Sequence, residues 1–177
     1  MSVLILHSSR FGQSEKIARA IADELEAGGL SVEIAPITKK SDPQGYDGLA
    51  LVMSVRYGFF SGLANKLIKK YRSWLDTHPT LLVTVSLTAR NPEKRDPAVH
   101  SYTRKFLEKV AWAPTHTEVV AGALRYPIYN IFDRKAIQLI MHITNGETDP
   151  TKDIEYTDWE QVAQAGKDFA GIVQASK

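Results

Sequence analysis

Residues 3–14 constrain the fold of this chain more than any other stretch. Residues 3–6 form an unbroken apolar run with β-branched members, which is typical of a strand buried on both faces. Between Ile17 and Leu25 apolar residues recur at helical spacing, so we expect a helix to begin near Gln13. A buried strand, a short hydroxyl-rich turn and a helix N-terminus gather unpaired N–H groups and the positive end of the helix dipole at one point. The stretch therefore predicts an anion site.

The residues of the turn narrow the choice of anion. They lack both the glycine–lysine pattern of nucleoside-triphosphate loops and the Gly-x-Gly-x-x-Gly fingerprint of dinucleotide sites. The turn resembles the flavodoxin phosphate loop, in which hydroxyl and backbone N–H groups surround the monophosphate of FMN. Phe11 stands where that family usually has a hydroxyl, and Arg10 offers a charge-assisted contact that offsets the loss. The alternative is a connection that binds nothing. The cofactor-binding residues expected here are Ser9, Arg10, Phe11, Gly12, Gln13 and Ser14.

Apolar runs and amphipathic stretches alternate along the rest of the chain. We expect further strands at 32–37, 49–53, 81–85 and 119–124, and helices at 63–75, 102–110 and 157–173, the last opened by a capping box of Thr157 and Glu160. This alternation predicts an α/β fold with a doubly wound, five-stranded parallel sheet in the flavodoxin-like order 2-1-3-4-5. Because the chain has 177 residues, we expect residues 1–177 to form a single domain.

In that topology a ligand binds at the carboxyl ends of the first and third strands. The loops after the third and fourth strands are therefore expected to lie against the flavin ring. Tyr57 stands where flavodoxins often stack an aromatic ring, although a surface aromatic is the alternative, and Arg56 would favour reduced flavin electrostatically. The cofactor-binding residues expected in these loops are Ser54, Val55, Arg56, Tyr57, Gly58, Ser86, Leu87, Thr88, Ala89 and Arg90.

Composition excludes several classes of function. The chain has no cysteine, so disulfides, thiolate metal sites and a cysteine nucleophile are excluded, which fits a reducing compartment; no metal site is expected. No apolar run approaches the length that spans a bilayer, and we expect no signal peptide. A net charge of +2 is too small to indicate nucleic acid as a partner.

Residues 125–156 exceed what a short flavodoxin needs between its last strand and last helix. Within them, 131–143 has the pattern of an amphipathic helix with basic residues beside its apolar face. Three interpretations are open for this insertion: a lid or substrate wall, a docking surface for a membrane or lipophilic molecule, or part of the core.

Several segments together resemble one flavodoxin-like family. They are residues 54–58, 89–95, 101–102, 104–107, 121–127, 133–134, 139–141, 146–149 and 156–160. On these segments the chain resembles the bacterial menaquinone-dependent protoporphyrinogen IX dehydrogenases. The likeness covers nearly the whole chain, including the insertion.

The resemblance implies an enzyme of haem biosynthesis. Such enzymes use FMN to oxidise protoporphyrinogen IX to protoporphyrin IX, a removal of six electrons, and pass the electrons to menaquinone or ubiquinone. They are cytoplasmic and associate peripherally with the cytoplasmic face of the inner membrane. The preferred quinone and the oligomeric state stay open.

The substrate is a large apolar macrocycle with two propionates, so its site needs apolar surface and a few cations. The candidate cations are Arg90, Lys94, Arg95 and Arg125, each with a solvated surface charge as the alternative. No catalytic residue is assigned, because lone histidines such as His7 and His142 are more often structural. Two other functions are open: a flavodoxin-type electron carrier, although such carriers are usually strongly acidic, and an NAD(P)H:quinone oxidoreductase.

Overall fold

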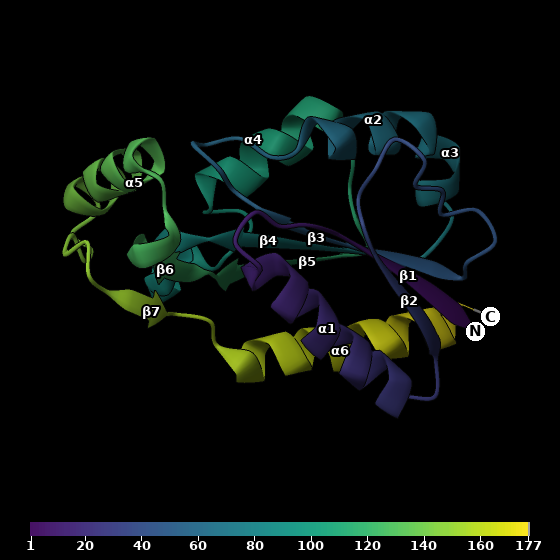
Figure 1. Ribbon diagram of the computed structural model, residues 1–177. Helices are drawn as coiled ribbons and strands as arrows, with labels where there is room; N and C mark the ends of the chain where they lie inside the picture. Colours follow the sequence, from purple (N-terminus) through teal and green to yellow (C-terminus); the bar gives the residue numbers. More distant parts are fainter. Residues whose placement is uncertain (177) are drawn as a thin grey trace.

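A computed structural model describes residues 1–176 of the chain (Figure 1). Its centre is a five-stranded parallel sheet in the order β2-β1-β3-β4-β5, which confirms the predicted topology. The strands are β1 Ser2–Ser8, β2 Ser31–Pro36, β3 Gly48–Ser54, β4 Thr80–Ser86 and β5 His116–Ala121.

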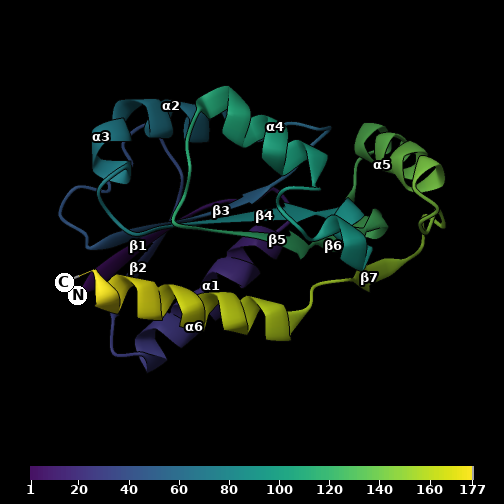
Figure 2. The ribbon, with the colours of Figure 1, turned by 180° about the vertical axis from the view of Figure 1, so that it is seen from behind.

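Helices cover both faces of this sheet (Figures 1 and 2). One face carries α1 Gln13–Ala27 and α6 Trp159–Ala175, and the other carries α2 Gly62–Lys70, α3 Arg72–Leu75 and α4 Ser101–Val110. Because both faces are covered, every apolar side chain of β3 is at most 1% exposed. Two apolar clusters, one on each face, form the core.

Two predicted elements are divided in the structure. The expected helix at 63–75 is interrupted at Tyr71, whose backbone dihedrals of −108° and 24° leave the helical region while its ring is buried. The expected strand at 119–124 ends at Ala121, because the Gly122 carbonyl accepts the N–H of Tyr156 instead of a bond within the sheet. Beyond Gly122, β6 Ala123–Arg125 pairs antiparallel with β7 Asp153–Glu155 as a separate ribbon.

The predicted capping box at the start of the last helix is wrong. Asp158 is the N-cap of α6, and its Oδ1 accepts the N–H of Gln161 at 3.2 Å. The hydroxyl of Thr157 is used elsewhere: it donates to the Ala121 carbonyl at 2.8 Å and accepts from Gln13 Nε2 at 2.8 Å. Thr157 therefore ties α6 to β5 and α1 instead of capping the helix.

The segment between β6 and β7 lies beyond one end of the layers, opposite the chain termini (Figure 1). It holds the 3₁₀ turn η3 Tyr126–Ile128 and α5 Ile131–Ile143, whose bounds match the helix expected there. A small cluster packs this segment against β6; it consists of Leu124 of β6 with Tyr126, Tyr129 and Met141. Two further 3₁₀ turns, η1 Leu87–Arg90 and η2 Pro92–Lys94, follow β4. No helix in residues 1–176 combines the length and the apolar character needed to cross a bilayer.

Candidate functional site

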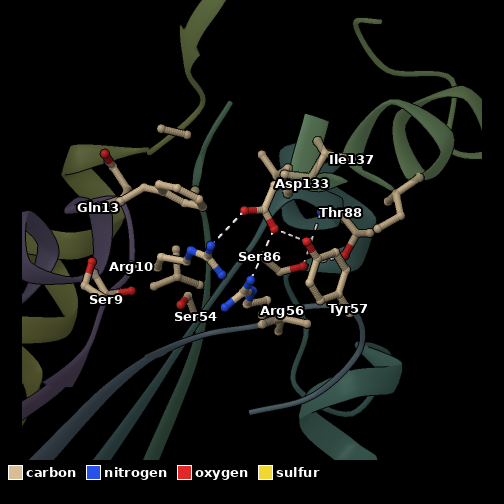
Figure 3. A pocket seen from close by; sticks show the side chains of 18 of the residues that line it. Ser9, Arg10, Gln13, Ser54, Arg56, Tyr57, Ser86, Thr88, Asp133 and Ile137 are labelled. Atoms are coloured by element: carbon tan, nitrogen blue, oxygen red, sulfur yellow. Dashed lines mark hydrogen bonds and ion pairs between the residues drawn. The ribbon is translucent and has the colours of Figure 1, made fainter. Parts of the chain in front are cut away.

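A cleft opens at the carboxyl ends of β1, β3 and β4, next to α5 (Figure 3). It encloses about 920 Å³, part of which is open solvent at its mouth. The lining residues are Ser9, Arg10, Phe11, Gln13, Ser14, Ser54, Val55, Arg56, Tyr57, Gly58, Val85, Ser86, Leu87, Thr88, Tyr102, Gly122, Ala123, Tyr129, Asp133, Ile137 and Ile140.

The turn before α1 has the features of an anion site. Gly12 is the N-cap of α1 with a φ of 88°, a left-handed conformation that favours glycine, and no side chain caps the helix. The side chain of Ser14 lines the cleft, yet the residue is 1% exposed and its Oγ has no hydrogen-bond partner among residues 1–176. A buried hydroxyl without a partner beside an uncapped helix N-terminus fits a phosphate group that supplies the missing contact.

Phe11 departs from the flavodoxin pattern for a reason visible in the structure. Its ring packs on Tyr129, with the centroids 4.7 Å apart. An aromatic contact with the segment that leads into α5 therefore replaces the hydroxyl. Gln13 is also used structurally, since its amide donates to Thr157 and its Oε1 accepts from Arg125 at 3.1 Å.

Asp133 of α5 is the polar centre of the cleft (Figure 3). Asp133 is 3% exposed, and its carboxylate forms ion pairs with Arg10 at 2.9 Å and with Arg56 at 3.2 Å. The hydroxyl of Tyr57 and the amide of Asn130 also donate to it. One carboxylate thus joins the phosphate-loop side of the cleft, the loop after β3 and α5. The hydrogen bond to this carboxylate raises the pKa of Tyr57, because ionisation would place two negative charges in contact.

The loop after β3 is a tight turn closed by paired backbone hydrogen bonds between Arg56 and Phe59, at 2.8 and 2.9 Å. Tyr57 and Gly58 at its tip both have positive φ, 49° and 82°. This conformation is unfavourable for a tyrosine, so the turn holds Tyr57 in a position that an unconstrained loop would rarely adopt. The guanidinium of Arg56 lies 5.1 Å from the centroid of the Tyr57 ring.

The loop after β4 contributes only its first half to the cleft. Ser86, Leu87 and Thr88 line it, whereas Ala89 is fully buried in a separate cluster and Arg90 points elsewhere. Arg90 donates to the Leu87 carbonyl at 2.9 Å and to Thr144 Oγ1 at 2.9 Å. It therefore fastens the C-terminal end of α5 to the β4 loop.

None of the four candidate substrate cations is among the residues that line the cleft. Arg90 is held as described, Arg95 pairs with Asp158 at 2.9 Å, and Arg125 pairs with Asp153 at 3.1 Å and Glu155 at 3.3 Å. Lys94 is exposed. The cations that do face the cleft are Arg10 and Arg56, which the sequence had assigned to the cofactor alone.

The sequence-based prediction missed a second group of lining residues. They are Val85, Tyr102, Gly122, Ala123, Tyr129, Asp133, Ile137 and Ile140. Gly122 and Ala123 follow the last parallel strand, so they could have been predicted from the rule that ligands bind at the carboxyl ends of strands. Asp133 belonged to one of the segments that carry the family resemblance and stood in the expected first turn of a helix, but neither observation placed it in the cleft. Among residues 1–176, no group of histidine and acidic side chains is arranged to hold a metal ion.

Comparison with known proteins identifies relatives of the whole chain. Residues 4–151 match the flavodoxin domain family. A protoporphyrinogen IX dehydrogenase (quinone) of Escherichia coli K12 is 42% identical over 97% of this chain and 96% of its own length. One of Leishmania major is 40% identical over 96% of this chain and 74% of its own.

Solved structures with the same fold are much more distant in sequence. The two-electron reduced flavodoxin of Megasphaera elsdenii has a TM-score of 0.57 at 12% identity, covering 96% of this chain and 98% of that one. A WrbA-like flavodoxin of Agrobacterium tumefaciens has a TM-score of 0.54 at 12% identity, covering 99% and 98%. At this low sequence identity, the two similarities show a shared fold and nothing about function.

Proposed function

Because this chain belongs to the flavodoxin-domain family and, within it, to the quinone-dependent protoporphyrinogen IX dehydrogenases, we propose that it oxidises protoporphyrinogen IX to protoporphyrin IX. Its cofactor is FMN, and its electron acceptor is a quinone. The observation that carries this proposal is the 42% identity over 97% of the chain, which extends through α5. A flavodoxin-like electron carrier has no need of this added cleft wall.

The residues of the cleft fit FMN by the chemistry of their donors. Ser9, Ser14 and the N-terminal N–H groups of α1 would hold the phosphate, and the loops after β3 and β4 would enclose the ring system. Bound FMN supplies the redox chemistry of the reaction. The chain contributes binding, orientation and the electrostatic environment of the cleft.

For the substrate, the cleft offers both parts of the required surface. Ile137 and Ile140 give the cleft an apolar wall suited to a macrocycle. Arg10 and Arg56, with side chains 40% and 48% exposed, share the single negative charge of Asp133, so together they keep a net positive charge for propionates at the mouth. Arg90, Lys94, Arg95 and Arg125 stay predicted contacts, and three of them would first have to leave the protein partners that they have here.

The outward side of α5 suggests how the enzyme reaches a quinone dissolved in a bilayer. Four large apolar side chains of this helix are exposed: Ile131 by 68%, Phe132 by 85%, Leu139 by 60% and Ile143 by 70%. We call these four residues the α5 outer face. Lys135 is exposed on the same helix, which suits anionic lipid headgroups. We therefore propose peripheral docking on a membrane through the α5 outer face, next to the cleft.

An anaerobic experiment tests the reaction. FMN-loaded protein is mixed with protoporphyrinogen IX while flavin absorbance is followed, and a quinone analogue is then added. We expect bleaching, followed by recovery and porphyrin fluorescence. Absence of bleaching with the porphyrinogen, together with rapid bleaching by NADPH, would make the NAD(P)H:quinone oxidoreductase the correct function.

A further inference from the structure

A chain of hydrogen bonds leads from the cleft into the core beneath α4. Ser86 Oγ lies 2.9 Å from Thr88 Oγ1, which lies 3.1 Å from His100 Nε2. On the other side of the ring, His100 Nδ1 lies 2.7 Å from Thr103 Oγ1, which lies 2.7 Å from Thr84 Oγ1. We call these five residues the His100 chain. Ser86 and Thr88 line the cleft (Figure 3), whereas His100 is 1% exposed and does not.

The position of His100 determines which ring nitrogen carries hydrogen. His100 is the N-cap of α4, and its Nδ1 accepts the N–H of Thr103 at 3.4 Å. Burial, assisted by the positive charge of Lys94, lowers the pKa of His100, so the ring is neutral at pH 7. A neutral imidazole has one N–H, and a nitrogen that accepts a hydrogen bond cannot carry it. The hydrogen therefore lies on Nε2.

This tautomer gives the chain a direction. Nε2–H donates to Thr88 Oγ1, so the hydroxyl of Thr88 turns its own hydrogen toward Ser86. Ser86 Oγ also accepts the backbone N–H of Thr88 at 3.3 Å. With two donors directed at its oxygen, Ser86 retains its own O–H for a partner in the cleft.

We propose that His100 is a positioning residue that makes Ser86 a hydrogen-bond donor to the ring system of bound FMN. The inference rests on the proposed function for the identity of the ligand. Flavin rings carry carbonyl and ring-nitrogen acceptors, which a fixed donor recognises, and a donor favours the form of the ring that holds more negative charge.

The reverse arrangement of hydrogens makes the opposite prediction. If Nδ1 carried the hydrogen, it would donate to Thr103, and the chain would continue through Thr84 to the Glu118 carbonyl at 3.4 Å. Ser86 would then donate into the protein and offer the ligand only an acceptor. The inner end of the chain lies at Thr84, beside the Glu118 carbonyl, which takes up no proton at neutral pH. The His100 chain therefore orients hydroxyl groups and exports no protons.

The first test reads the tautomer directly. Two-dimensional ¹⁵N–¹H spectra of histidine rings distinguish Nε2–H, Nδ1–H and imidazolium, and they are recorded on the ligand-free and the FMN-loaded protein. We expect Nε2–H for His100 in both. An Nδ1–H or imidazolium signal in either state overturns the proposal.

The second test measures the effect on the ligand. His100→Asn keeps a short acceptor for the N-cap but no longer reaches Thr88, so the dissociation constant of FMN should rise about 5-fold, as for one neutral hydrogen bond. The flavin reduction potential should fall. Thr84→Val, at the far end of the chain, should change neither quantity. Equal effects of the two substitutions would overturn the proposal, because the reverse direction alone requires Thr84.

FMN binding and the tautomer of His100 are measured independently of each other. If the wild-type protein binds no FMN, the proposed cofactor is wrong, whereas the tautomer of His100 in the ligand-free protein still decides the direction of the chain.

Discussion

Strand β3 and helix α5 are both rich in large apolar side chains, but they bury them to opposite extents. In β3, Leu49, Leu51 and Met53 are at most 1% exposed between two layers of helices. In α5, Phe132 is 85% exposed and Ile143 is 70% exposed. The apolar character of β3 is thus accounted for by folding, because burial removes those side chains from water. That of the α5 outer face is not, and such patches mark interaction surfaces.

The two elements are also held in place differently. β3 is fixed by ladders to β1 and β4 and by apolar packing on both faces. α5 relies largely on polar contacts at its ends, from Asp133 to the two cleft arginines and from Arg90 to Thr144, with Met141 as its one fully buried apolar side chain. A helix attached in this way presents an apolar surface without needing that surface for stability.

Removing the α5 outer face should have the largest effect of the changes considered, and the quantity that it changes is the affinity for membranes. Replacing Ile131, Phe132, Leu139 and Ile143 by serine should weaken binding to vesicles with anionic lipid by about 100-fold or more, because each buried apolar side chain contributes about 1.5–3 kcal/mol. Co-sedimentation with vesicles measures it. FMN content and turnover with a water-soluble quinone should persist. The control is Val99→Ser, since Val99 is 57% exposed outside α5. Unchanged vesicle binding would contradict membrane docking by α5.

Matched truncations test the contrast in stability. Leu51→Ala in β3 should lower the free energy of unfolding by about 3 kcal/mol, through lost burial and the cavity left behind. Phe132→Ala removes a larger side chain, but one that is 85% exposed, and should change it by less than about 0.5 kcal/mol. Urea denaturation followed by circular dichroism gives both values. Similar losses for the two variants would mean that the α5 outer face belongs to the core after all.

The same contrast explains what could be predicted from the sequence. The strand order and the cleft loops could be predicted because they depend on local sequence patterns. Examples are the continuous apolar run Leu49–Met53 and the turn before Gln13. The role of Asp133 depends on partners as distant as Arg56, 77 residues away, and no local pattern reports such a contact. The break at Gly122 and the tie made by Thr157 have the same origin, because each depends on a hydrogen bond between elements far apart in sequence.

The attachment of α5 can be loosened without disturbing the sheet. Asp133→Asn removes the negative charge that holds Arg10 and Arg56, and both arginines are exposed enough to regain water. We expect a local cost of about 1–2 kcal/mol, which makes amide hydrogen exchange in α5 roughly 10-fold faster. Exchange in β3 should be unchanged. Glu15→Gln breaks an exposed ion pair with Arg19 and should alter neither element. Faster exchange in β3 after Asp133→Asn would mean that α5 and the sheet open together.

The smallest expected effect is a change in the pH dependence of stability when the buried His100 is replaced. Burial lowers the pKa of His100 in the folded protein below its ordinary value near 6.5. Below about pH 6.5 the unfolded chain then binds protons more readily than the folded one, so stability falls as the pH falls from 7.5 to 5.5. His7, whose pKa burial also lowers, contributes in the same direction.

Urea denaturation across this range should therefore give a flatter pH profile for His100→Asn than for the wild type. A wild-type slope in His100→Asn would mean that folding does not lower the pKa of His100, which would contradict the neutral ring from which the donor role of Ser86 is argued.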